Sequence, residues 1–64
     1  MIGTMKFVVR YLHSSGEIAR SYPMAAEDAA RIAADWVRHG ERDVLVESLD
    51  TGDVWTPEQF KAAR

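Results

Sequence analysis

The first apolar pattern of the chain, over residues 4–13, has a period of two. One parity holds Met5, Phe7, Val9 and Tyr11. This alternation predicts a β-strand, and Phe, Val and Tyr suit a pleated, half-buried surface. Residues 14–16, Ser-Ser-Gly, predict a turn, after which residues 17–22 return as a second strand. Pro23 lacks a backbone N–H and is expected to end that strand.

Residues 25–39 change to the helical period. Their apolar positions form one continuous stripe: Ala25, Ala29, Ile32, Ala33, Trp36 and Val37. This spacing predicts an amphipathic helix. Off the stripe, Glu27 and Arg31 form a favourable i,i+4 pair, and Gly40 is typical of the position that follows a helix C-terminus. No Ser, Thr, Asp or Asn directly precedes the stripe, so we expect a weak N-terminal cap.

The second half of the chain begins with a further strand over residues 43–49, Asp-Val-Leu-Val-Glu-Ser-Leu. Residues 50–53, Asp-Thr-Gly-Asp, predict a hairpin turn, with Gly52 at the position that needs a left-handed conformation. Residues 53–56 are then expected to return as a fourth strand.

The C-terminal segment, residues 57–63, is predicted to be a short helix. Thr56 suits the N-cap, Pro57 the first helical position, and Gln59 completes a capping box. We expect Phe60 to pack back on the body of the molecule.

The resulting order is ββαββ with a short terminal helix, and it predicts an α+β fold. One amphipathic helix covering one face of a four-stranded sheet is the economical two-layer arrangement. Sixty-four residues make a single domain, residues 1–64. The pattern does not give the strand order; if strands two and three run parallel, the crossover through the helix should be right-handed.

More apolar side chains are present than one helix can cover. One parity, expected to face the helix, holds Phe7, Val9, Tyr11, Ile18, Tyr22, Val44, Val46 and Val54. The opposite face then carries Lys6, Val8, Arg10, Leu12, Leu45, Glu47, Leu49 and Trp55. A sheet face that meets only water should be mostly polar, and exposed apolar surface beside charges is typical of an interface. We therefore predict partner binding through Val8, Arg10, Leu12, Leu45, Glu47, Leu49 and Trp55.

Two arrangements would remove this surface. The parity of the third strand could be inverted, which would place Leu45 and Leu49 in the core and expose Val44 and Val46. Alternatively, the C-terminal helix could fold over the second face, with Phe60 covering it.

Composition narrows the chemistry. With no cysteine, disulfides and thiolate metal sites are excluded, and His13 and His39 are too few for a protein zinc site. We predict no metal and no cofactor. The net charge of −2 gives no general attraction to nucleic acid or anionic lipid, and no apolar run approaches the ~20 residues of a membrane span. The N-terminus lacks a secretory pattern, so a cytoplasmic location without a membrane partner is expected.

Two motifs suggest catalysis, and both have simpler explanations. Residues 50–52, Asp-Thr-Gly, match the triplet of aspartic proteases, but they lie between two predicted strands, where these are ordinary turn residues. His13 beside Ser14 and Ser15 is a sequence neighbourhood and not a triad geometry. The chain is therefore not predicted to be an enzyme.

The leading hypothesis is a non-enzymatic protein-interaction module, either a homodimer or a regulatory or inhibitor subunit. Arg10 and Glu47 would set the register, and Trp55 with the leucines would supply buried area. The alternative is a sheet that binds single-stranded nucleic acid, with Lys6 and Arg10 beside Trp55 or Tyr11. Glu47 on the same face and the acidic balance of the chain disfavour it.

Overall fold

The computed structural model describes residues 5–63. The predicted start of the first strand at residue 4, and the two ends of the predicted domain 1–64, lie outside this range. Within it the chain forms a four-stranded sheet and two helices, which confirms the predicted α+β fold and the ββαββ order with its terminal helix. The elements are β1 (Phe7–Leu12), β2 (Ile18–Arg20), α1 (Ala26–Arg38), β3 (Arg42–Ser48), β4 (Val54–Trp55) and α2 (Pro57–Ala63).

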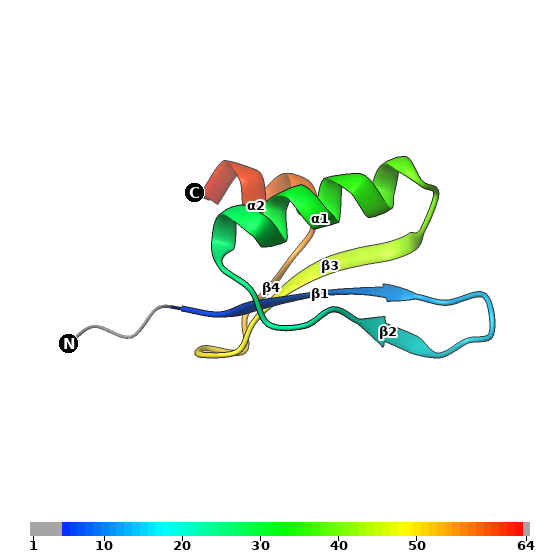
Figure 1. Cartoon of the computed structure of the whole chain (residues 1–64), viewed down its shortest axis with the longest axis horizontal. Helices are drawn as coiled ribbons and strands as arrows, with labels where there is room; N and C mark the ends of the chain where they lie inside the picture. The colour runs from blue at the N-terminus through cyan, green and yellow to red at the C-terminus, as the bar shows by residue number, and fades with distance from the viewer. Residues whose placement is uncertain (1–4, 64) are drawn as a thin grey trace.

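The strand order is β2-β1-β3-β4, and each strand is antiparallel to its neighbours. Because β2 and β3 both pair antiparallel with β1, they run parallel to each other, and α1 connects them across the sheet. Figure 1 shows α1 and α2 on the same side of the sheet. The opposite side of the sheet is covered by neither helix.

The core lies between the sheet and the helices. Its buried members are Phe7, Val9, Ala29, Ala33, Val44, Val46 and Phe60. The two central strands supply the valines, and Val9 and Val46 are fully buried. Ala29 and Ala33 on α1 are also fully buried, and their small side chains allow the helix to pack close to the sheet. Of the predicted helix stripe, Ala29, Ile32, Ala33 and Trp36 face this core, whereas Val37 is 51% exposed. The predicted parity of the central strands also faces the core.

The ends of α1 match the sequence pattern. Ala25 is the N-cap and makes no side-chain capping hydrogen bond. At the other end Gly40 has φ of 86°, and the N–H of Glu41 donates to the carbonyl of Trp36 at 3.0 Å. The left-handed conformation of Gly40 turns the chain so that N–H groups after the helix reach carbonyls that the helix leaves unpaired.

The predicted capping box of α2 is confirmed. The Thr56 hydroxyl oxygen accepts the Gln59 N–H, and the Thr56 N–H donates to the Gln59 side-chain oxygen, each at 3.1 Å. This cap sets the start of α2 and directs Phe60 into the core, where its ring meets Phe7 edge-on with centroids 5.1 Å apart. The alternative in which α2 covers the second face of the sheet is therefore wrong.

The parity predicted for β4 is wrong. In the observed register Trp55 pairs with Val46 and Val54 pairs with Glu47. Paired residues of neighbouring strands share a face, so Trp55 lies on the helix side and Val54 on the opposite side. The prediction failed because the register of a hairpin depends on the conformation of its turn, and a shift of one residue moves every side chain to the other face.

The second strand is also inverted relative to the prediction. Ile18 pairs with Leu12 and Arg20 pairs with Arg10, so Ile18 and Arg20 lie on the side away from the helices. Tyr22, predicted to face the helix, follows the end of β2 and is strongly exposed. The turn over residues 13–17 shifts the inward–outward alternation of the side chains of β2 by one position. The sequence pattern alone does not reveal this shift.

A β-bulge interrupts the central pair of strands. Arg10 pairs with Leu45 and Leu12 with Arg42, so two β3 residues, Asp43 and Val44, oppose one residue of β1. Asp43 has φ of 51°, in the left-handed region that aspartate tolerates better than most residues. Val44 lies in the core and Leu45 on the opposite side by ordinary alternation, and the bulge places Arg42 on the same side as Leu12. The sequence analysis did not predict it.

Candidate protein-interaction surface

The sheet side away from α1 and α2 is called the open face. By register and alternation it carries Lys6, Val8, Arg10, Leu12, Ile18, Arg20, Arg42, Leu45, Glu47, Leu49 and Val54. Several of its aliphatic side chains remain accessible: Ile18 is 53% exposed, Leu49 50% and Val54 40%. Leu12 and Leu45 are half-buried. The inverted parity considered for β3 is therefore wrong, since Val44 and Val46 are buried whereas Leu45 is half-buried and Leu49 exposed.

Three charged side chains meet near the middle of the open face. Glu47 on β3 lies between two arginines, with its Oε1 3.8 Å from Arg10 Nη1 and 3.4 Å from Arg20 Nη1. Arg20 donates the hydrogen bond at 3.4 Å. Because Arg10, Arg20 and Glu47 come from three adjacent strands, this charged cluster exists only when β2, β1 and β3 have assembled.

Strand register explains the cluster. Arg10 and Arg20 are directly opposite each other on β1 and β2, and like charges in that position repel. Glu47 is on β3, the neighbour of β1 opposite to β2. It pairs with Val8, which lies two residues before Arg10 and on the same face of β1. The carboxylate therefore reaches both guanidinium groups and offsets part of their repulsion.

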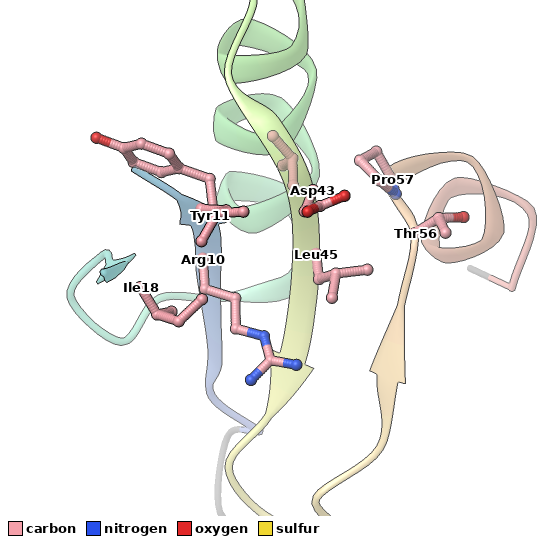
Figure 2. A pocket seen from close by; sticks show the side chains of 9 residues that line it. Arg10, Tyr11, Ile18, Asp43, Leu45, Thr56 and Pro57 are labelled. Carbon is pink, nitrogen blue, oxygen red and sulfur yellow. The ribbon is translucent and has the colours of Figure 1, made fainter. Parts of the chain in front are cut away.

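An open hollow of about 490 Å³ adjoins the charged cluster. Figure 2 shows Arg10, Ile18 and Leu45 on one side of the strands, with α1 behind them. Leu12 also lines the hollow, and Asp43, Thr56 and Pro57 lie at its β3–β4 end. The chain leaves the sheet after β4 at Trp55, so β3 extends past its outer neighbour and helps to form this depression.

Six of the seven residues predicted to bind a partner lie on the open face. Five of these are at least partly exposed: Arg10, Leu12, Leu45, Glu47 and Leu49.

The other two predicted residues are placed differently. Val8 is on the open face but is 5% exposed, because it is a short side chain on an interior strand with neighbours on both sides. Trp55 is on the helix side. Ile18, Arg20 and Val54 also lie on the open face, where the sequence pattern did not predict them. Their placement depends on the registers of the two hairpins, and alternation along the sequence does not give those registers.

Trp55 belongs to an aromatic group on the helix side of the sheet. Its ring centroid lies 6.1 Å from that of Phe7 and 5.4 Å from that of Phe60. Tyr11, the other aromatic considered for stacking nucleic-acid bases, packs edge-on against Trp36 of α1 at 4.9 Å. Neither aromatic side chain is therefore on the open face with Lys6 and Arg10.

Residues 50–52, the Asp-Thr-Gly triplet, form the turn between β3 and β4. The hydroxyl oxygen of the buried Ser48 accepts the N–H groups of Asp50 and Thr51, each at 3.2 Å. The Gly52 N–H donates to the Ser48 carbonyl at 2.9 Å, and Gly52 has φ of 82°. The triplet is therefore a turn, and Asp, Thr and Gly are all common in turns.

His13 and Ser15 interact in the exposed turn between β1 and β2. His13 Nδ1 accepts the Ser15 N–H at 3.0 Å and lies 2.9 Å from the Ser15 hydroxyl oxygen. A nucleophile needs a base that is itself oriented by a third group. Among residues 5–63, no side chain other than Ser15 is hydrogen-bonded to the His13 ring.

A second depression, of about 740 Å³, lies between α1 and α2. Ala30, Ala34 and Val37 line it together with charged residues of both signs. Arg31 and Arg38 on its rim are each paired with an aspartate of α1 three residues earlier, Asp28 and Asp35. The two arginines of this depression thus each have a carboxylate of their own, whereas Arg10 and Arg20 share one.

Two further features were sought in the described part of the chain. Over residues 5–63, no three His, Asp or Glu side chains lie close enough together to hold a metal ion. Neither described helix has the length and apolar character that crossing a membrane requires.

Comparison with known proteins gives no relative: the chain matches no protein-family model, no curated protein and no solved structure. The functional argument therefore rests on the surface itself.

Proposed function

We propose that the chain is a small, non-enzymatic protein-interaction module that binds its partner through the open face. The observation that carries the proposal is the exposure of Ile18, Leu49 and Val54 on a sheet face that α1 and α2 leave uncovered. Exposed aliphatic side chains beside charged groups are typical of docking surfaces. Arginine in such a setting is enriched among residues that dominate binding energy.

The edges of the sheet support the face as the docking region. β2 has three residues and is followed by Pro23, and β4 has two residues and is followed by Pro57. Short edge strands and nearby prolines are common protections against edge-to-edge pairing. Pairing of a partner strand with either outer strand is therefore disfavoured, which supports docking on the open face.

A binding comparison with matched variants tests the proposal. Leu49→Glu alters the open face, whereas Val37→Glu alters α1 on the helix side, and the two side chains are 50% and 51% exposed. Tagged wild-type and variant proteins would be used to capture partners from a lysate of the native source, followed by mass spectrometry. We expect a partner that is retained by wild type and Val37→Glu and lost by Leu49→Glu.

Thermal melting by circular dichroism is the control, because both variants should remain folded. A partner that is lost equally with both variants, or with neither, would contradict docking through the open face.

The partner is either a second copy of the chain or a different protein. Sedimentation at two concentrations distinguishes them, since self-association grows with protein concentration. Salt-dependent binding of oligonucleotides would instead favour the nucleic-acid alternative.

A further inference from the structure

The charged cluster on the open face is electrostatically incomplete. Arg10 and Arg20 contribute two positive charges and Glu47 one negative charge, so the cluster carries +1. Both arginines approach the same carboxylate oxygen. Asp43, the other acid beside the hollow, forms no ion pair among the described residues. One positive charge therefore remains without a matching carboxylate.

The arginines also have hydrogen-bonding capacity left over. Each guanidinium has five N–H donors. The contacts to Glu47, at 3.8 and 3.4 Å, are longer than the roughly 2.7–2.9 Å of a tight charge-assisted hydrogen bond. Arg20 is 53% exposed, so its donors are accessible from solvent. A second carboxylate approaching from outside would find donors on both arginines.

The surroundings of the cluster select the rest of the ligand. Arg10 also lines the hollow, beside the aliphatic side chains of Leu12, Ile18 and Leu45. Aliphatic groups suit leucine, isoleucine or valine from a partner protein, whereas nucleic-acid bases need aromatic side chains on which to stack. Trp55 lies on the helix side, and Tyr11, which also borders the hollow, has its ring packed edge-on against Trp36 of α1.

A second copy of the chain is a poor electrostatic match. With the hollow included, the open face carries four positive and two negative charges, a net +2: Lys6, Arg10, Arg20 and Arg42 against Glu47 and Asp43. Two such faces packed together would repel each other, and each Glu47 already serves two arginines. Burying charge without a partner opposes association.

We infer that the partner is a different protein whose surface presents a carboxylate beside aliphatic side chains. Its carboxylate binds Arg10 and Arg20, and its aliphatic group enters the adjoining hollow. This inference rests on the proposed function, because it assumes docking through the open face.

Selection from a random-peptide phage-display library tests the chemistry without a known partner. Selected peptides would be synthesised and titrated into isotope-labelled protein, with amide shifts followed by NMR. We expect peptides rich in Asp or Glu next to Leu, Ile or Val, with shifts concentrated on β1, β2 and β3 and with affinity that falls as salt is added.

Three variants sharpen the test. Arg20→Ala should weaken binding by up to about fivefold, as loss of a partly exposed ion pair predicts. Glu47→Gln should strengthen it by a similar factor, because it removes the competing carboxylate. Arg31→Ala, on α1 and paired with Asp28, is the charge-matched control and should leave affinity unchanged.

The outcomes separate the inference from the proposed function. Peptides that shift the open face without needing an acid, or weaker binding by Glu47→Gln, would overturn the acidic partner and leave open-face docking intact. A dimer that Glu47→Gln dissociates, or tighter binding of a single-stranded oligothymidylate than of any peptide, would overturn it in favour of a second copy or nucleic acid. If no peptide shifts the open face, the proposed function fails as well.

Arg20 lies on an edge strand and is half exposed, so its variant tests binding without depending on the core.

Discussion

The two faces of the sheet are built from the same strands and have different chemistry. The helix face holds fully buried valines at positions 9 and 46 and a group of aromatic rings, and Ser48 is the buried polar side chain of the described residues. The open face mixes half-exposed aliphatic side chains with a cluster of three charges. The helix face thus has the composition of a core, and the open face mixes apolar and charged side chains in the way that is typical of docking surfaces.

Because of this difference, substitutions on the two faces are expected to affect different properties. A domain of this size has a core that supplies roughly 3–5 kcal/mol, so the helix face has little stability to spare. Substitutions on that face should unfold the protein, whereas substitutions on the open face should change binding and leave the fold intact. The following variants test this division, in order of decreasing expected effect.

Phe60→Ala is expected to have the largest effect. The ring is 3% exposed and packs against Phe7, and truncating a buried phenylalanine costs about 3–5 kcal/mol. That is comparable to the whole stability expected of the core. Circular dichroism should show a largely unfolded protein, whereas Phe60→Leu, which keeps most of the volume, should still melt cooperatively. A near-normal melt for Phe60→Ala would mean that α2 does not contribute to the core.

Trp55→Ala should destabilise the protein by about 2–3 kcal/mol, somewhat less than loss of a fully buried aromatic because Trp55 is partly exposed. The neighbouring Val54 is the matched control, since it points to the open face and Val54→Ala should cost under about 1 kcal/mol. Urea denaturation followed by circular dichroism measures both. Equal costs for the two substitutions would contradict the observed register of β4.

Asp43→Val should cost about 1–2 kcal/mol, because a β-branched residue is poorly tolerated at φ of 51°. Asp43→Gly should be neutral or stabilising at the same position, since glycine adopts this conformation without a steric penalty. The measurement is again urea denaturation. If the valine and glycine variants have the same stability, the conformation of Asp43 does not hold the bulge at Asp43 and Val44 in place.

Leu49→Ser should have the smallest effect on stability, within about 0.5 kcal/mol, because the side chain is half exposed on the open face. Its effect should instead be on partner binding, in the capture experiment described above. A loss of stability similar to that of the helix-face variants would show that the open face is part of the core.

The sequence predicted the elements that depend on local chemistry. The apolar stripe of α1, the glycine after it and the Thr56–Gln59 capping box each act within a few residues, so they are visible in the chain itself. The parity of β1 and β3 was also predicted, because their apolar residues alternate over several positions. Six of the seven residues predicted for the open face therefore lie on it, and Val8 is the one of them that is buried.

The predictions that failed concern hairpin register. Trp55 and Val54 were placed on the wrong faces, Ile18 likewise, and Arg20 was not considered at all. β2 and β4 are two or three residues long, so alternation within them gives almost no information. Their facing is decided by how each turn closes and which residues then pair with the longer central strands.

The sequence by itself determined an amphipathic helix, two apolar central strands and a surplus of aliphatic side chains, because periodicity and capping are local properties. The tertiary structure decided which side α2 covers, that Trp55 joins the core, and that Arg10, Arg20 and Glu47 meet. Those outcomes depend on contacts between residues far apart in the sequence, such as Arg20 and Glu47, which are 27 positions apart. Such pairing is set by register and packing, which the order of residue types along a short strand does not specify.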